Sequence, residues 1–411
     1  MEPAVLFISY DGITDPLGQS QVLPYLAGLR RMGYQIVLIS CEKPAEYTAK
    51  FTEVKTQTAE AGIHWYPLPY TKRPPVISTL IDLYRIRKKA LTLHREYNFR
   101  LVHTRPGIPA LVGVWLKKKK GIPFLHDIRE FYADSRVEGG IWNARNPLFQ
   151  LIYRYFKRKE TEQLQCCDGI VCLTKTAESV IRKEPAFKTA TPLEVIPCSV
   201  DLQLFSLDAI DKKQQEALQR DMGITPDDTV ITYLGSIGGW YLTDEMMRFC
   251  KLLSQKLPGA KFLFISPHLH EQIRESGRQH GIDPSQIIIR KSDRSDIPQL
   301  LSLSTFSVFF IKPCFSKLSS SPTKHGELMA MGIPVITNAG VGDVQAIVEK
   351  YHAGYLVKDF SDKSFNTVIN QMLQEPIPDP AEIRRGAEEI YSLEKAVEAY
   401  GKMYGKILKV E

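Results

Sequence analysis

The sequence lacks any run of about 18 consecutive apolar residues, the length that a membrane-spanning helix requires. Its amino terminus has no basic segment followed by a long apolar stretch, so we interpret it as a first strand and not as a secretion signal. Internal repeats and low-complexity stretches do not stand out either. These absences predict a globular protein that resides in the cytoplasm.

Evidence for paired cysteines and for the common nucleotide-binding loops is also missing. The seven cysteines form no Cys-x-x-Cys motif and their number is odd, which favours reduced thiols over disulfides or a zinc site. Neither the Gly-x-Gly-x-x-Gly fingerprint nor the Gly-x-x-x-x-Gly-Lys-Ser/Thr loop occurs. The sequence therefore disfavours dinucleotide-dependent enzymes and P-loop NTPases.

Positive charge is in excess: the formal net charge of +7 suits anionic ligands or an anionic membrane surface. The stretch Ile77–Leu93 has a basic amphipathic pattern that could lie on a membrane, and its alternative is a solvated face over a core stripe. Its basic residues are Arg85, Arg87, Lys88 and Lys89, and its apolar stripe contains Ile77, Leu80, Ile81, Tyr84 and Leu91. No basic cluster has interleaved aromatic residues at a recognisable spacing, so we expect no nucleic-acid partner.

Short apolar runs alternate with amphipathic stretches, which is the pattern of an α/β protein with a parallel, doubly wound sheet. The predicted strands are Val5–Ser9, Gln35–Ser40, Leu101–Thr104, Pro123–His126, Ile170–Leu173, Thr229–Leu234, Lys261–Ile265, Gln286–Ile289, Phe306–Ile311 and Pro334–Thr337. The predicted helices are Ser20–Arg31, Ile77–Tyr97, Leu148–Leu164, Leu242–Gln255, Glu271–His280, Lys324–Met331 and Val344–Lys350.

The strand pattern stops and restarts, which predicts two Rossmann-like domains, residues 1–200 and 201–390, with a ligand cleft between them. Residues 391–411 are predicted to form a final amphipathic helix. Its apolar stripe consists of Leu393, Val397, Tyr400, Tyr404 and Ile407.

Two candidate sites follow strands of the first domain. The loop Asp11–Ser20 contains Gly18 and leads into a helix whose free N–H groups suit a phosphate or a sugar hydroxyl; an ordinary βα turn remains the alternative. After the strand Pro123–His126, the side chains of His126, Asp127 and Arg129 offer a donor-acceptor, a carboxylate and a cation. The alternative for this segment is a solvated loop whose charges pair with each other.

The strongest motif is residues 321–336, where a polar loop enters a helix and Gly332 ends it. The helix N-terminus and Lys324 predict a diphosphate site, and Glu327 lies on the same helix face, where its carboxylate can accept bonds from both ribose hydroxyls. The alternative is a surface helix with a Lys324–Glu327 salt bridge. A weaker candidate is the turn that begins with Gly235 and Ser236, whose small residues permit close backbone approach.

These motifs together resemble the group 1, or family 4, retaining glycosyltransferases of the GT-B fold, in a bacterial branch that makes surface polysaccharides. The resemblance covers essentially the whole chain. It rests on Asp11-Gly12 with 15–20, on Ile196–Asp201 with Phe205, and on 322–327 with Ala330, Gly332, Pro334 and Val335. It implies that the final helix crosses back to the first, acceptor-binding domain, and that the second domain binds the nucleotide sugar.

The resemblance also implies roles for individual residues. Glu327 is similar to the glutamate that binds the donor ribose, and His126 to the histidine near the reacting carbon. The expected catalytic residues are His126, Lys324 and Glu327. The expected donor-binding residues are Gly18, Gly235, Ser236, Lys317, Ser319, Thr323, Lys324 and Glu327. The expected acceptor-side residues are Asp11, Gln19, Asp127 and Arg129.

Two positions depart from the family pattern. Ser319 stands where the family often has a first glutamate, and the Gly235 turn lacks the usual Arg and Lys, so Lys324, helix amides and Lys317 are expected to bind the diphosphate. Since no Asp-x-Asp motif occurs, we expect no metal and no cofactor besides a UDP- or GDP-linked substrate.

The resemblance implies retaining transfer to a glycan or lipid-linked acceptor, in the cytoplasm and at the inner face of the cytoplasmic membrane. The alternatives are a nucleotide-sugar epimerase of the same fold and a degenerate protein that binds nucleotide sugars without catalysis.

Overall fold

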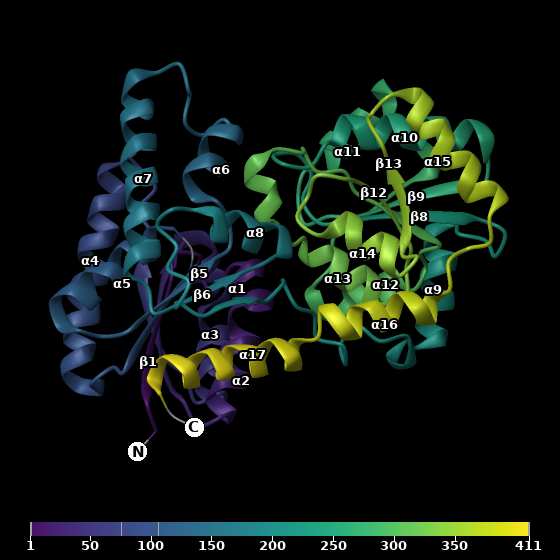
Figure 1. Ribbon diagram of the computed structural model, residues 1–411. Helices are drawn as coiled ribbons and strands as arrows, with labels where there is room; N and C mark the ends of the chain where they lie inside the picture. The colour runs from purple at the N-terminus through teal and green to yellow at the C-terminus, as the bar shows by residue number, and fades with distance from the viewer. Residues whose placement is uncertain (1, 75, 106, 410–411) are drawn as a thin grey trace. The chain divides into compact units, whose positions relative to one another are not determined.

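The computed structural model describes residues 2–74, 76–105 and 107–409, which form two compact α/β units. Unit 1 takes the chain up to Pro197 and again from Leu393, and unit 2 contains Cys198–Ser392. Figure 1 shows the two sheets with their surrounding helices. Within the described residues, no helix is long and apolar enough to span a bilayer.

Unit 1 contains a parallel seven-stranded sheet with the order β3-β2-β1-β4-β5-β6-β7. The strands are β1 (Ala4–Ser9), β2 (Gln35–Glu42), β3 (His64–Pro69), β4 (Leu101–Arg105), β5 (Phe124–Ile128), β6 (Gly169–Cys172) and β7 (Leu193–Val195). The helices are α1 (Pro16–Gln21), α2 (Leu23–Arg31), α3 (Pro44–Glu60), α4 (Ile77–Tyr97), α5 (Ile108–Lys120), α6 (Tyr132–Glu138), α7 (Pro147–Cys166), α8 (Lys175–Lys183) and α17 (Leu393–Leu408).

Helices cover both faces of this sheet, because side chains of a strand point alternately to opposite sides. In β1, Val5 and Phe7 pack in the core under α2 and α17, whereas Leu6 and Ile8 pack in the core under α4 and α5. The predicted return of the terminal helix to the first domain is confirmed. Val397 of α17 lies where a Cβ on Gly28 of α2 would be 2.5 Å away, so the missing side chain permits this close approach.

Unit 2 repeats the architecture with a parallel six-stranded sheet in the order β10-β9-β8-β11-β12-β13. Its strands are β8 (Thr229–Leu234), β9 (Ala260–Ile265), β10 (Ile287–Arg290), β11 (Phe306–Val308), β12 (Val335–Asn338) and β13 (Gly354–Val357). Its helices are α9 (Lys212–Met222), α10 (Thr243–Lys256), α11 (His270–Gln279), α12 (Ile297–Leu301), α13 (Thr323–Ala330), α14 (Val344–Lys350), α15 (Asp362–Gln374) and α16 (Pro380–Ile390). Short 3₁₀ turns occur at η1 (Leu207–Ala209), η2 (Pro284–Gln286), η3 (Arg294–Asp296) and η4 (Phe315–Ser319).

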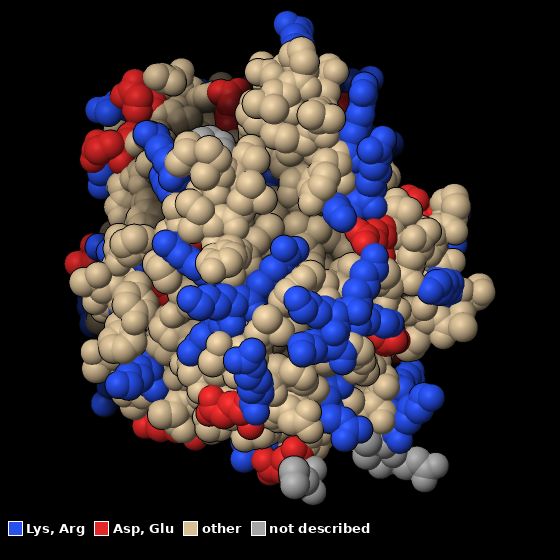
Figure 2. All heavy atoms as spheres, turned by 90° about the vertical axis from the view of Figure 1, so that its left-hand side faces the viewer, with Lys and Arg blue, Asp and Glu red and all other residues tan. Residues whose placement is uncertain are grey.

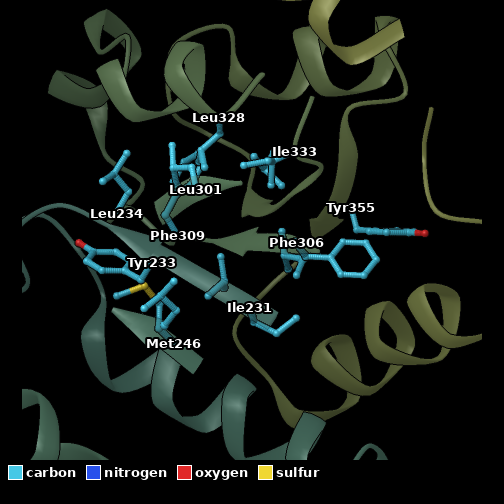
Figure 3. Close-up of a cluster of buried hydrophobic side chains, with 14 of the residues drawn as sticks. Ile231, Tyr233, Leu234, Met246, Leu301, Phe306, Phe309, Leu328, Ile333 and Tyr355 are labelled. Atoms are coloured by element: carbon cyan, nitrogen blue, oxygen red, sulfur yellow. The ribbon is translucent and has the colours of Figure 1, made fainter. Parts of the chain in front are cut away.

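The core of unit 2 joins the sheet to the helix that follows the polar loop. In Figure 3, Leu328 of α13 and Leu301 of α12 point toward Phe309, next to the β8 side chains Ile231 and Leu234. Each of these side chains is at most 6% exposed, so α13 is anchored by burial of its apolar face.

The structure corrects the predicted element boundaries in two ways. The single helix predicted at Ser20–Arg31 is two helices that meet at Val22, because Pro24 lacks an N–H group and disfavours a continuous helix through this point. Three strands were not predicted: β3, β7 and β13, each at an edge of its sheet. These three strands have no run of fully buried apolar residues, so the sequence lacks the signal that marks the central strands.

Gly354 at the start of β13 provides a test of this packing. Its φ is +137°, and an added Cβ would lie 1.9 Å from the backbone oxygen of Val335. We expect Gly354→Ala to lower the free energy of unfolding by about 2–4 kcal/mol, as seen for overpacked and strained sites. The control Gly223→Ala also has positive φ, +63°, but meets open space, so about 1 kcal/mol is expected. Equal losses in urea titrations would contradict the steric argument.

Candidate active site

Lys324 lies at the carboxyl ends of the unit 2 strands. The β8 strand ends at Leu234, and the next residue, Gly235, has φ +110° and would place a Cβ 3.2 Å from the Lys324 Nζ. The structure therefore brings together two of the predicted donor-binding residues, Gly235 and Lys324. The backbone oxygen of Ser236, also in this turn, accepts a hydrogen bond from the Tyr233 hydroxyl.

The Lys324 ammonium group is buried among aromatic rings. Its Nζ lies 3.8 Å from the centroid of Tyr241 and 4.2 Å from that of Tyr233, and the side chain is 6% exposed. Within the described residues the Nζ has no hydrogen-bond partner. Burial lowers the pKa of Lys324 to about 7, although the nearby Glu327 opposes this shift. An ammonium group in this setting gains most from an anion that supplies the missing bonds.

Glu327 is the second buried charge on α13. One of its oxygens, Oε1, accepts a 2.7 Å hydrogen bond from Arg294, and the Glu327 side chain is 6% exposed. The alternative of a Lys324–Glu327 salt bridge is therefore wrong, since Arg294 occupies that place. Sequence reasoning missed Arg294, because nothing in the sequence near residue 294 marks it as a partner of a helix 33 residues later.

Contacts along helix α13 fix its position in unit 2. The hydroxyl of Tyr391 lies 3.0 Å from Nδ1 of His325, and burial lowers the pKa of His325 to about 3, so the imidazole is neutral. Gly326 permits the Tyr391 ring to approach, as a Cβ there would be 3.0 Å from the ring. Arg384 donates to the backbone oxygen of Ala330 at the other end of the helix. These contacts fix the direction in which the N-terminal amides of α13 point.

The other predicted donor-side residues have different surroundings. Lys317 lies with its Nζ 3.7 Å from the centroid of the Trp240 ring and is 8% exposed. Thr323 is half buried as the first residue of α13. Ser319 is fully buried, and its hydroxyl donates to the backbone oxygen of Ser316 at 2.8 Å. The structure thus gives the Ser319 hydroxyl a role within η4, and its donor contact stays a prediction.

In unit 1, the loop that follows β1 is organised by a buried carboxylate. Glu42 at the end of β2 is 3% exposed and accepts hydrogen bonds from the backbone nitrogens of Ile13 (2.8 Å) and Thr14 (3.1 Å). Gly18 packs against this loop, since a Cβ there would lie 2.2 Å from the backbone oxygen of Gly12. Position 18 therefore requires glycine because of the packing of the loop. Nothing in the sequence indicates the role of Glu42.

Of the predicted acceptor-side residues in this loop, Asp11 and Gln19 are both half buried. The Gln19 amide donates a 2.7 Å hydrogen bond to the backbone oxygen of Ile13, so this group supports the loop. Burial raises the pKa of Asp11, whereas the nearby Arg105 acts in the opposite direction.

At the end of β5, His126 is 5% exposed, and its Nδ1 has no hydrogen-bond partner within the described residues. Burial lowers the pKa of His126 to about 4, with His103 also lowering it and Asp127 opposing, so the imidazole is neutral at pH 7. In a neutral imidazole one ring nitrogen donates a hydrogen bond and the other accepts one.

Asp127, the next residue, belongs to a buried network with the C-terminal helix. Its Oδ2 accepts a 2.8 Å hydrogen bond from the Tyr400 hydroxyl and lies 3.4 Å from Nε2 of His103. Its Oδ1 lies 3.6 Å from Arg129, whose guanidinium donates to the Tyr400 hydroxyl at 3.3 Å. Burial alone would raise the pKa of Asp127, but Arg129 and His103 outweigh it and hold the pKa well below its usual range.

These contacts argue against the acceptor-side roles predicted for Asp127 and Arg129. Both side chains are buried, at 1% and 8% exposed, so the two charges lie close together as in the alternative, but in the interior and not in a solvated loop. Among the described residues, no three His, Cys, Asp or Glu side chains gather as metal ligands do.

Comparison with known families supplies the decisive observation. Residues 19–204 match the model described as glycosyltransferase family 4, and residues 214–390 match the one described as glycosyl transferases group 1. The chain belongs to this glycosyltransferase family. The first match covers most of unit 1 and extends a few residues into unit 2, and the second lies within unit 2. No curated protein sequence matches the chain.

Solved structures place the family member in the GT-B fold. A sucrose-phosphate synthase from Thermosynechococcus elongatus has 15% identity and a TM-score of 0.77 over 100% of both chains. Anabaena HepE in complex with UDP and glucose has 12% identity and a TM-score of 0.72, covering 98% of this chain and 100% of its own. WaaG, a glycosyltransferase involved in lipopolysaccharide biosynthesis, has 13% identity and a TM-score of 0.67, covering 96% and 99%.

The network around Asp127 generates a prediction. We expect Tyr400→Phe to lower the free energy of unfolding by about 1.5–3 kcal/mol, because it removes a hydrogen bond to a buried carboxylate. The control Tyr34→Phe removes a 3.3 Å bond to the neutral backbone oxygen of Gly401 on the same helix, for which about 1 kcal/mol or less is expected.

Denaturant titrations of both variants at pH 7 measure the difference. Because the pKa of Asp127 is lowered by folding, its contribution is complete above its unfolded pKa and is lost as pH falls through its folded pKa. A loss for Tyr400→Phe no greater than that for Tyr34→Phe would show that the Asp127 contact carries no special weight.

Proposed function

We propose that this glycosyltransferase moves a sugar from a UDP- or GDP-linked donor to a glycan or lipid-linked acceptor, with retention of anomeric configuration. The single observation that carries the donor assignment is the buried Lys324 ammonium, which has no hydrogen-bond partner in the described chain and lies beside Gly235. The UDP and glucose bound to Anabaena HepE support UDP as the nucleotide, and WaaG supports a role in polysaccharide biosynthesis of the cell envelope.

The donor diphosphate binds Lys324 and the first amides of α13 in this proposal. These amides carry the positive end of the helix dipole, which stabilises an anion at that position. The leaving diphosphate gains negative charge in the transition state, so a fixed cation in a site of low polarity lowers the barrier. Lys317 and Thr323 provide further contacts to the same group.

Glu327 binds the donor ribose in this proposal. Arg294 fixes the carboxylate through Oε1, and Oε2 accepts hydrogen bonds from the ribose hydroxyls. The neutral imidazole of His126 contacts the donor sugar near the reacting carbon, and the leaving phosphate accepts the proton of the acceptor hydroxyl. No protein nucleophile and no metal take part.

The direct test is incubation of the protein with a panel of UDP- and GDP-sugars, each with and without mixed glycan acceptors, followed by mass spectrometry. A glycosylated acceptor with release of nucleoside diphosphate is the expected result, and excess EDTA should leave the rate unchanged. A new nucleotide sugar formed from the donor alone would instead establish the epimerase. Nucleotide binding without either product would establish a non-catalytic binding protein.

For His126 we expect the alanine variant to lower kcat by about 100-fold and to change the donor KM little, since the contact acts mainly in the transition state. The matched control is His64→Ala, an exposed histidine at the start of β3, at the opposite edge of the same sheet. A normal kcat for His126→Ala would remove this residue from the catalytic group.

For Lys324 we expect nucleoside diphosphate binding to take up a proton above about pH 7. The free protein has a lowered pKa of about 7 at this site, and a bound diphosphate must raise it. Affinity should therefore weaken by up to about tenfold per pH unit above pH 7. Calorimetry in buffers of different ionisation enthalpy measures the proton uptake. Lys324→Met should abolish it, the exposed control Lys212→Met should retain it, and uptake that persists in Lys324→Met would refute the assignment.

A further inference from the structure

The first turns of α4 expose a row of large apolar side chains. Ile77, Leu80 and Tyr84 are 55%, 60% and 66% exposed, while the opposite side of the helix buries Leu83 and Ile86 in the core. The alternative in which this stripe packs on the core therefore does not hold for its N-terminal part. Three apolar residues within two turns of helix remain in contact with solvent.

A second row of the same kind occurs on α7. Leu148, Leu151 and Tyr155 are 58%, 64% and 48% exposed. Their spacing of three and four residues places them on one side of the helix. We name the six residues of the two rows, Ile77, Leu80, Tyr84, Leu148, Leu151 and Tyr155, the apolar helix-end surface.

The two rows lie at the same end of unit 1. Helix α4 follows the end of β3, and α7 follows α6 and the end of β5, so both begin beyond the edge at which the parallel strands end. Both helices pack against α5, and Figure 1 shows their N-terminal ends at the top left of the unit. Asp11 and His126 belong to strands or loops at this same edge.

Four exposed basic residues lie near this surface. Lys72 and Arg73 precede α4, Arg154 and Arg158 lie on α7, and all four are exposed. Among the described residues, none of these four forms an ion pair with a carboxylate. Figure 2 shows this side of the molecule: Lys and Arg gather in a broad band across its middle and lower part, and the upper part is mostly uncharged, with separate basic and acidic residues at its margins.

The basic residues predicted from the sequence to meet a membrane are mostly engaged within the protein. Arg85 donates to the Thr71 hydroxyl at 2.9 Å, and the Arg87 guanidinium lies 5.3 Å from the Trp115 ring. Lys89 lies 4.2 Å from the Tyr66 ring, which leaves Lys88 as the exposed member of the set. The structure thus moves the charged contact from the middle of α4 to the helix ends.

We infer that the apolar helix-end surface docks on a bilayer that contains anionic lipids. Exposed apolar rows with tyrosines among them suit the headgroup boundary, and the unpaired arginines and lysines complement a negative leaflet. The combination of exposed apolar rows and four exposed cations without ion-pair partners among the described residues favours an anionic lipid surface over a protein partner. The inference rests on the proposed function in one respect: the proposed lipid-linked acceptor gives the protein a reason to dock on a bilayer.

The experiment is cosedimentation of the full chain with vesicles of phosphatidylglycerol and phosphatidylcholine, and with vesicles of phosphatidylcholine alone. We expect binding to the anionic vesicles that weakens at high salt. The double variant Leu148→Asp/Leu151→Asp should weaken it by roughly tenfold or more, because apolar burial is lost and two negative charges are added. Arg154→Gln/Arg158→Gln should weaken it by about fivefold for each charge removed.

The matched control is Leu373→Asp/Ile377→Asp, which changes two side chains of unit 2 that are 45% and 55% exposed. It should bind vesicles like the wild type. Equal loss in this control, or equal and negligible binding of the wild type to both vesicle types at low salt, would overturn the inference. A wild-type dimer that the Leu148→Asp/Leu151→Asp variant disrupts, without vesicle binding, would assign the surface to a second copy of the chain.

Transfer to a water-soluble acceptor separates this inference from the proposed function. The vesicle-binding variants should keep that activity, because the changed residues lie outside the proposed donor and catalytic groups. Vesicle binding without any transferase activity would leave the docking surface in place and refute the proposed function alone.

Discussion

The hydrogen bond from Tyr400 to Asp127 joins the C-terminal helix to the sheet formed by the N-terminal part of the chain, so the stability of unit 1 depends on both segments. A carboxylate that is 1% exposed is stable only with compensating partners, because burial of an unpaired charge costs several kcal/mol. Those partners come from β4, from the residues after β5 and from α17. Since His126 precedes Asp127 in the same strand, the C-terminal helix also fixes the backbone that carries the proposed catalytic imidazole.

In unit 2 one of the two buried charges on α13 lacks the compensating partners that Asp127 has in unit 1. Glu327 has Arg294 as a partner, whereas Lys324 is surrounded by rings and is stabilised by loss of its proton near neutral pH. A structural lysine would gain more from a carboxylate or from exposure to water. The arrangement is favourable once an anion binds, so the incomplete bonding of Lys324 and the rigid attachment of α13 below it are two parts of one binding function.

The sequence alone predicts the central strands and the motif helices, because buried elements contain apolar runs or apolar residues at a regular period. The predicted helix Ile77–Tyr97 has the bounds of α4, and the predicted donor-binding residues Lys324 and Gly235 lie next to each other in the structure. The sequence does not predict the edge strands β3, β7 and β13 or the roles of Glu42 and Arg294. Each of these depends on contacts between distant segments, such as the 33 residues between Arg294 and Glu327, which no local pattern contains.

The same limitation explains why the sequence left two interpretations of the apolar stripe of α4 open. A helical period shows that a side of the helix is apolar, but it does not show what covers that side. Helix α4 has one side that packs on the sheet and a second apolar row, and only the three-dimensional packing separates Leu83 from Leu80. Exposed apolar rows of this kind mark surfaces that contact a membrane or another macromolecule, which is why the exposure of Leu80, and not the helical period, supports the proposed docking.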